Sequence, residues 1–150
     1  MQKATIFQEI LLRDHAEAII LFDGVCNFCN STINFLIDHD PKRKLRYMSL
    51  QSALAIALQE ELGSKLDSVV CITADGIFVR SDAVLKIAQL LPYPYRLLTA
   101  GKLIPKRWRD NLYDAIAKRR YQWFGKSEFC RIPTAKERML FIETSKEESC

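Results

Sequence analysis

A short apolar strand that leads through a turn into a helix with two cysteines constrains this chain more than any other feature. Residues 18–22 are Ala-Ile-Ile-Leu-Phe, a continuous apolar run that is typical of a buried strand. Asp23 and Gly24 follow as a turn, and apolar residues from Phe28 onward recur with helical spacing. The sequence therefore predicts a strand, a tight turn and a helix, with Cys26 at the start of that helix.

The next segment repeats the order of strand and helix. Pro41 ends the first helix, and residues 45–50 alternate as a second strand. A second helix is marked by leucines at four-residue spacing, namely Leu50, Leu54, Leu58 and Leu62. Gly63 closes this helix, because glycine readily adopts the left-handed conformation that ends many helices.

A hairpin and a third helix complete the predicted core. The β-branched run 69–73 precedes Asp75-Gly76, a strong hairpin turn signal, so the strand after the turn should return antiparallel. Ser81 or Asp82 is expected to cap the helix that follows. The order βαβαββα over about residues 18–91 is the thioredoxin topology, so we predict an α/β, thioredoxin-like core.

A helical extension is predicted beyond this core, over about residues 95–125. Its large side chains recur at spacings of four, four, three and four: Trp108, Leu112, Ile116, Arg119 and Trp123. Such a stripe is typical of a helix face packed against a core. Gly125 ends this helix, and polar residues 144–150 are expected to form a frayed tail. Since 150 residues is the usual size of one domain, residues 1–150 are expected to form a single domain.

The chemistry of the chain is expected at Cys26 and Cys29. Cys26 stands at a helix start, where unpaired backbone N–H groups and the helix dipole favour a thiolate. Cys29 lies almost one turn later on the same side, near enough to close an intramolecular disulfide. We therefore interpret Cys26 as the attacking and Cys29 as the resolving thiol of a redox pair.

A zinc site is the main chemical alternative, because a Cys-x-x-Cys pair is also half of many zinc sites. The other candidate ligands, none of which forms a second close pair, are Cys71, Cys130, Cys150, His15 and His39. Cys71 is expected to be a buried hydrophobic residue, and Cys130 to pack unless it is a third redox thiol or a ligand. Cys150 is expected to be a mobile thiol. A metal-binding protein thus remains an alternative, as does a redox-inert thioredoxin-like binding module that uses the basic C-terminal helix.

The stretch from Asp23 to Cys29, Asp-Gly-Val-Cys-Asn-Phe-Cys, resembles the Asp-x-x-Cys-x-x-Cys signature of the DCC family of thiol-disulfide oxidoreductases. Tyr113-Asp114, residues 120–125 (Arg-Tyr-Gln-Trp-Phe-Gly) and Cys130 also resemble that family, so the likeness covers most of residues 19–133. The resemblance implies a thiol-disulfide oxidoreductase without naming its substrate. Unlike better-known thioredoxins, the chain has no proline in residues 66–68, before the third strand.

Asp23 is the third candidate catalytic residue. Its carboxylate could take the proton of Cys29 during resolution. The alternative is a structural role, because an Asp beside a glycine is common in turns. Both roles are consistent with its place three residues before Cys26.

Charge and hydropathy limit the expected partners. The net charge is +4, and residues 102–126 hold eight Lys or Arg against two Asp. We expect these basic side chains to be solvated opposite a packed face, and therefore expect neither a nucleic acid partner nor peripheral membrane contact. Residues 1–18 lack the uninterrupted apolar stretch of a secretory signal, and no apolar run is long enough to span a bilayer.

These features predict a cytoplasmic protein whose five cysteines serve redox chemistry rather than structural cross-links. Its expected partners are a protein or low-molecular-weight thiol or disulfide, together with an electron donor that the sequence does not identify. We expect neither a bound cofactor nor a metal.

Overall fold

The computed structural model describes residues 2–24, 26–63, 66, 68–125, 135 and 137–142. The elements in chain order are α1 (Gln2–Arg13), β1 (Ala18–Phe22), α2 (Asn27–Asp38), β2 (Leu45–Ser49), α3 (Ala53–Leu62), β3 (Val70–Thr73), β4 (Gly76–Val79), α4 (Arg80–Leu90), the 3-10 helix η1 (Tyr95–Leu103), α5 (Lys106–Phe124) and the 3-10 helix η2 (Arg138–Leu140). From β1 to α4 this is the predicted order βαβαββα. The helical extension, here η1 and α5, is also confirmed.

Four strands form one mixed sheet in the order β2-β1-β3-β4. The central strand β1 pairs in parallel with β2, where Ile20 lies opposite Tyr47. On its other side β1 pairs antiparallel with β3, where Ile20 lies opposite Cys71. The hairpin of β3 and β4 is antiparallel, as the Asp75-Gly76 turn predicted. This pairing and order give the fold its thioredoxin-like topology.

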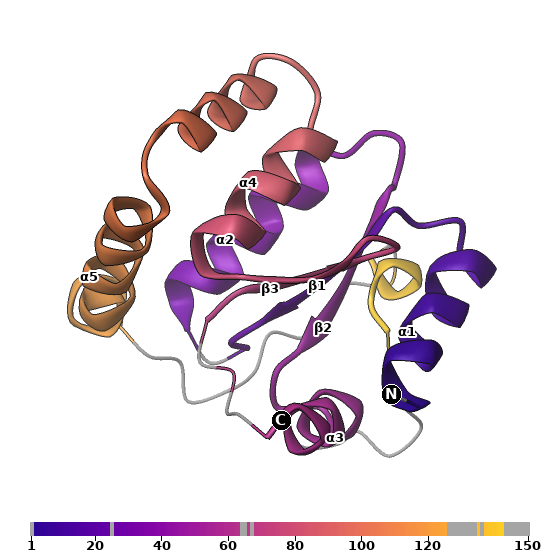
Figure 1. The fold of residues 1–150 in the computed structure, drawn as a ribbon. Coiled ribbons are helices and arrows are strands. Elements are labelled where there is room, and N and C mark those ends of the chain that lie inside the picture. Colours follow the sequence, from indigo (N-terminus) through magenta and orange to yellow (C-terminus); the bar gives the residue numbers. More distant parts are fainter. Residues whose placement is uncertain are drawn as a thin grey trace.

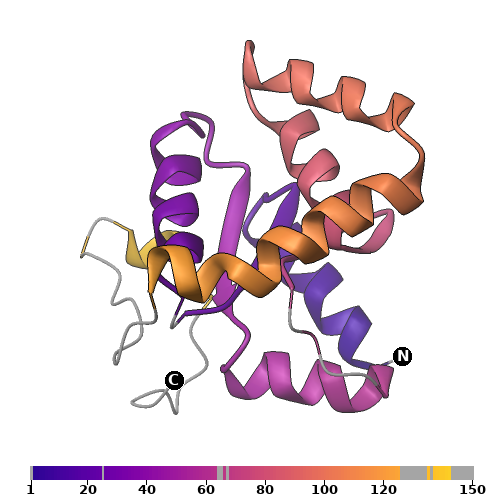
Figure 2. The ribbon, with the colours of Figure 1, turned by 90° about the vertical axis from the view of Figure 1, so that its left-hand side faces the viewer.

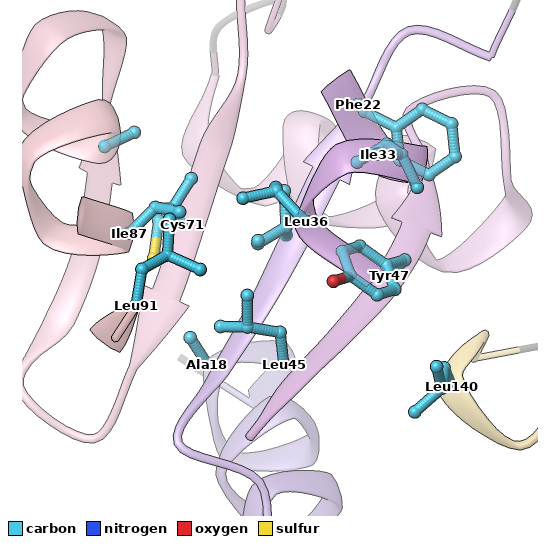
Figure 3. Packing of buried hydrophobic residues seen from close by; sticks show 12 residues of the cluster. Ala18, Phe22, Ile33, Leu36, Leu45, Tyr47, Cys71, Ile87, Leu91 and Leu140 are labelled. Carbon is cyan, nitrogen blue, oxygen red and sulfur yellow. The ribbon is translucent and has the colours of Figure 1, made fainter. Parts of the chain in front are cut away.

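The sheet separates two hydrophobic layers, because successive side chains of a strand point to opposite faces. Ala18, Ile20 and Phe22 of β1 pack with α2 and α4. Ile19 and Leu21 pack on the other face with α1 and α3. Figure 1 shows this sandwich of helices around the sheet, and Figure 3 shows Cys71 of β3 grouped with Ile87 and Leu91 in the first layer.

Helix α1 is an element that sequence analysis did not predict. Its buried residues are Phe7, Ile10 and Leu11, which follow helical spacing and join the layer beneath α3. Without α1, this face of the central strands would be covered by α3 alone among the described helices. Charged residues such as Lys3, Glu9 and Arg13 interrupt the apolar residues of this segment in the sequence, so its apolar face is not evident from local composition.

The predicted caps of α4 are wrong. The helix begins at Arg80, and its N-cap residue Val79 makes no side-chain capping bond. Ser81 instead donates a hydrogen bond to the carboxylate of Asp110 on α5. Asp82 likewise serves another purpose: it binds residues of α5 rather than the backbone of α4.

Two basic residues of α5 hold Asp82. The Nζ atom of Lys106 lies 2.5 Å from one carboxylate oxygen of Asp82, and Arg109 Nη1 lies 3.2 Å from the other. The hydrogen bond from Lys106 lowers the pKa of Asp82, against the opposing effect of burial. The polar residues at the start of α4 therefore fasten the extension to the core.

The face of α5 that packs inward also differs from the prediction. Trp108 is 71% exposed and Trp123 58% exposed, and Leu112 between them is exposed as well. The face that meets the core is shifted by one position, to Arg109, Tyr113, Ala117, Arg120 and Phe124. The expectation that the Trp and Leu stripe is core packing is therefore wrong.

This shift predicts that Trp108→Ala will change the free energy of unfolding by less than about 0.5 kcal/mol, because exposed side chains contribute little to stability. Leu36→Ala is the matched control, since Leu36 is buried between α2 and the sheet; we expect it to cost about 2–5 kcal/mol. Urea unfolding measures both variants. A loss above about 2 kcal/mol in Trp108→Ala would show that the indole packs against the protein after all.

Three expectations fall outside the described residues. These are the frayed tail over residues 144–150 and the roles of Cys130 and Cys150. They stay predictions.

Candidate active site

Cys26 is the N-cap residue of α2, as the sequence predicted. The turn after β1 is closed by a hydrogen bond of 3.2 Å from the Cys26 N–H to the Asp23 carbonyl. The Cys26 backbone is extended (φ −87°, ψ 117°), and its carbonyl accepts the first helical bond, from Asn30. Its sulfur accepts a hydrogen bond of 3.4 Å from the backbone N–H of Cys29. A helix N-terminal N–H group is thus directed at the Cys26 sulfur.

Cys29 lies next to Cys26, and both are free thiols in this structure. Burial raises the pKa of Cys29 to about 12, helped by a hydrogen bond with Cys26 and by the charge of Cys26. Arg120 partly opposes this rise. At neutral pH the proton therefore stays on Cys29. Solvent access, by contrast, favours Cys29. Cys26 has no exposed surface, whereas Cys29 is only partly buried.

The carboxylate of Asp23 is the centre of a buried polar cluster. Gln51 Nε2 donates to Asp23 Oδ1 at 2.9 Å. Arg120 Nη2 donates to Asp23 Oδ2 at 3.3 Å, and the Tyr121 hydroxyl donates to the same oxygen. The side chains of Asp23 and Arg120 are each only 10% exposed, so this is a buried ion pair. These donors hold the Asp23 carboxylate in one place beside the cysteine turn.

Gln51 also ties the cluster to the backbone of the turn. Its Oε1 atom accepts hydrogen bonds from the backbone N–H of Gly24 at 3.2 Å and from the hydroxyl of Ser49 at 2.5 Å. Asn30 donates to the Gly24 carbonyl at 3.0 Å from the first turn of α2. The turn between β1 and α2 is therefore held by side chains from α2, from the segment after β2 and from α5.

Arg120 brings a positive charge to the cysteine pair. Burial lowers its pKa, but the hydrogen bond with Tyr121 and the charges of Cys29 and Cys26 outweigh burial and raise it. The pKa of Tyr121 is raised as well, by burial and by its hydrogen bond to Asp23. Arg120 therefore stays charged, and its charge favours the thiolate form of nearby cysteines.

The C-terminal half of α5 is fastened to the start of α2. Asn27 Nδ2 donates to the Phe124 carbonyl at 3.0 Å, and the rings of Phe28 and Phe124 stack with centroids 4.8 Å apart. Figure 2 shows α5 running across the molecule toward the start of α2. Gly125 then ends α5 at φ 78°, a left-handed conformation that favours glycine. The extension thus contributes directly to the surroundings of the cysteines.

Another residue of α5 binds the segment before β3, where thioredoxins usually carry a proline. The backbone N–H of Val69 donates to the Tyr113 hydroxyl at 3.0 Å. The segment that follows residues 66–68 is therefore in contact with the extension.

A cavity of about 300 Å³ lies among α2, α4, α5 and β1. Cys29, Asp23 and Arg120 line one part of it. Apolar side chains make up most of the remaining wall. Cys26 is not among the residues that line this cavity.

The other residues considered in the sequence lie elsewhere in the structure. Cys71 is buried within β3, as predicted, and burial raises its pKa to about 12. His39 stacks on Phe35 at the end of α2, and His15 lies in the turn before β1. Within the described residues, no group of three or more His, Cys, Asp or Glu side chains is arranged to hold a metal ion.

Sequence analysis did not identify Gln51, Arg120 or Tyr121 as site residues. Arg120 and Tyr121 belong to the segment that resembles the DCC family, but that resemblance assigned them no role. Gln51 belongs to no motif and no periodic pattern in the sequence. The informative observation would have been the inward stripe of α5 at Tyr113, Ala117 and Arg120, with its spacings of four and three. Hydropathy alone does not reveal this stripe, because two of its three residues are polar.

Known proteins are similar to most of this chain. A family model described as DCC1-like thiol-disulfide oxidoreductase matches residues 20–126, which include every residue of the polar cluster. The uncharacterized protein YuxK of Bacillus subtilis is 37% identical over 127 residues, covering 83% of this chain and 93% of YuxK. A chloroplastic DCC family protein of Arabidopsis thaliana is 39% identical over 118 residues, covering 76% of this chain and 69% of that protein. No solved structure gives a significant match.

Proposed function

This chain belongs to the DCC1-like thiol-disulfide oxidoreductase family, and we propose that it cycles Cys26 and Cys29 between a dithiol and an intramolecular disulfide. The observation that carries the proposal is the hydrogen bond from the helix N-terminal N–H of Cys29 to the Cys26 sulfur. It favours a thiolate on the first cysteine of a pair that lies one turn apart. A disulfide-reduction assay with the purified protein tests the activity.

The proposed reaction has two exchange steps. The Cys26 thiolate attacks one sulfur of a substrate disulfide, a mixed disulfide forms, and the other substrate sulfur leaves as a thiolate. Cys29 then loses its proton and attacks the Cys26 sulfur, which releases the second substrate thiolate. The protein ends with a Cys26–Cys29 disulfide, and the substrate has gained two electrons. A thiol or dithiol donor returns the protein to its starting state.

The burial of Cys26 adds a condition to this scheme. Because Cys26 has no exposed surface, a substrate sulfur reaches it only after a local opening at the start of α2. Cys29 is poorly suited to make the first attack, because burial raises its pKa to about 12 and keeps that thiol protonated at neutral pH. A thiolate, not a thiol, is the nucleophile in disulfide exchange.

Asp23 is proposed to take the proton from Cys29 in the second step. Once Cys26 is in a mixed disulfide, its charge no longer raises the pKa of Cys29, but burial, the largest cause, remains. Removing that proton at neutral pH therefore benefits from a base. The Asp23 carboxylate acts electrostatically on Cys29 and is held in place by Arg120, Tyr121 and Gln51.

Asp23→Asn is expected to slow the resolving step by about a hundred-fold and the attacking step by much less, because only resolution needs the base. Rapid-quench measurement of mixed disulfide against time separates the two steps. Tyr121→Phe is the matched control, since it removes one hydrogen bond to Asp23 but keeps the carboxylate. We expect resolution in Tyr121→Phe to stay close to that of the wild type. Equal slowing in both variants would mean that Asp23 only organises the turn.

The substrate is proposed to be a protein or low-molecular-weight disulfide, with a thiol as electron donor. This follows from the activity class of the family. No helix in the described part of the chain is both long and apolar enough to cross a membrane. The Arabidopsis relative is named as chloroplastic, and the cytoplasmic location of this chain stays a prediction.

A redox-inert binding module is the second candidate function, and the exposed face of α5 supports it. Trp108, Leu112 and Trp123 form an apolar stripe on a helix rich in Lys and Arg. Such a surface suits a partner with apolar and anionic groups. Failure to reduce any disulfide, together with loss of partner binding in Trp108→Ala, would favour this candidate. Metal analysis of freshly reduced protein tests the third candidate, a metal-binding protein.

A further inference from the structure

The cavity beside Cys29 is built jointly by the core and the extension. Phe28 and Ile33 of α2, Ile87 of α4, and Ile116 and Ala117 of α5 contribute to its wall. Its volume of about 300 Å³ is at the lower end of the range found for small-molecule sites. Because α5 forms one side, this cavity depends on the extension that follows the thioredoxin-like core.

The polar groups of this wall already have partners within the protein. Asp23 and Arg120, the two charged residues that line it, bind each other. The hydroxyl of Thr32 donates to the Phe28 carbonyl at 2.9 Å, and the hydroxyl of Tyr113 accepts the Val69 N–H. A ligand in this cavity would therefore be held by apolar contacts rather than by charge. Apolar cavities of this kind take up neutral, apolar molecules in preference to charged ones.

The cavity also reaches a reacting sulfur, because Cys29 is part of its wall. A disulfide whose substituent occupied the cavity would place its sulfur atoms near Cys29, whose backbone N–H binds the Cys26 sulfur. We propose that this cavity binds the apolar substituent of a neutral, low-molecular-weight disulfide, so that the protein favours aromatic or alkyl disulfides over charged peptide disulfides. This inference rests on the proposed function and names its substrate class.

The reaction with such a substrate follows the two exchange steps already given. With 4,4′-dithiodipyridine, attack releases one pyridinethiolate and leaves a mixed disulfide on the protein. Resolution releases the second pyridinethiolate and forms the Cys26–Cys29 disulfide. Two pyridinethiolates are thus produced for each dithiol oxidised, and both absorb light at wavelengths where the disulfide does not.

A binding experiment without redox chemistry tests the cavity first. The probe is 1,2-bis(4-pyridyl)ethane, which has the two pyridine rings of 4,4′-dithiodipyridine but carbon in place of both sulfurs. Calorimetry should show saturable binding to the wild type and to the Cys26→Ser/Cys29→Ser variant. Ala117→Leu places extra carbons in the cavity and should weaken binding by about ten-fold or more. Ala115→Leu is the matched control, because Ala115 is exposed on the same helix; its binding should equal that of the wild type.

A kinetic experiment then tests substrate choice. Reduced protein carrying Cys130→Ser and Cys150→Ser is mixed in single-turnover reactions with 4,4′-dithiodipyridine or with glutathione disulfide. We expect Ala117→Leu to lower the rate constant for 4,4′-dithiodipyridine by about ten-fold and to leave the rate constant for glutathione disulfide within about two-fold. Ala115→Leu should change neither rate constant.

The outcomes separate the two proposals. Absence of saturable binding in the wild type, or equal binding in Ala117→Leu, would overturn the cavity as a ligand site. Equal slowing of both disulfides in Ala117→Leu would overturn the substrate preference. Binding as expected, with no pyridinethiolate released by the wild type, would support the ligand site and contradict the proposed redox function. Thermal unfolding of Ala117→Leu and Ala115→Leu verifies that each variant is folded.

Discussion

Cys26→Ser is expected to abolish disulfide reduction, whereas Cys29→Ser is expected to accumulate a mixed disulfide with its substrate. The Cys26 sulfur accepts the N–H group at the start of α2, so attack survives when only Cys29 is lost. Resolution does not survive, because no second thiol lies one turn away. Incubation with a model disulfide, followed by intact-mass measurement, detects the trapped species.

The remaining cysteines are controlled by replacing Cys130 and Cys150 with serine in both variants; Cys71 is buried within β3. Trapping by Cys26→Ser and not by Cys29→Ser would reverse the roles and make Cys29, the more exposed thiol, the attacking residue. Equal trapping by both variants would remove any division of roles. Either result would contradict the proposed mechanism.

Arg120→Met is expected to lower the free energy of unfolding by about 3–5 kcal/mol, because it leaves the buried carboxylate of Asp23 without its cation. Arg119→Met is the matched control. Arg119 is exposed, and its guanidinium carbon lies 5.9 Å from the centre of the Trp123 ring. We expect its loss to cost less than about 1 kcal/mol. Urea unfolding of both variants gives the comparison.

The double variant Asp23→Asn/Arg120→Met separates charge from packing. It removes both charges of the pair, so it should cost less than the sum of the two single variants. A single unfolding transition is expected in each case, because we propose that the core and the extension form one domain. A loss below about 1 kcal/mol in Arg120→Met would mean that the ion pair contributes little to stability.

The strands and the helix carrying the cysteines were predictable because their signals are local. The bounds of β1 agree with the apolar run at residues 18–22, and the β3–β4 hairpin lies around Asp75-Gly76. Gly63 ends α3 in a left-handed conformation with φ 66°, as its place after Leu62 suggested. Cys26 and Cys29 were predictable for the same reason, since the helix start that positions both is encoded within a few residues.

The contribution of α5 was not predictable from local pattern. Arg120 is buried because it pairs with Asp23, a residue 97 positions earlier in the chain. Periodicity in hydropathy cannot show such a pair, since an isolated arginine is normally solvated. The exposed tryptophans produced the stronger periodic signal, which moved the predicted inward face by one residue. Tertiary partners, rather than the hydropathy of the helix, decide which face of α5 meets the core.

The equilibrium redox titration of the Cys26–Cys29 couple tests the central claim most directly. Protein carrying Cys130→Ser and Cys150→Ser is equilibrated in dithiothreitol buffers of graded potential, and its free thiols are alkylated and counted by mass. We expect both thiols to disappear together in one monomeric, two-electron transition, which changes the ratio of oxidised to reduced protein about ten-fold for every 30 mV. Cys71, which is buried within β3, should stay a free thiol in every buffer. Three free thiols in the most oxidising buffer, or loss of thiols only through dimer formation, would contradict an intramolecular redox pair.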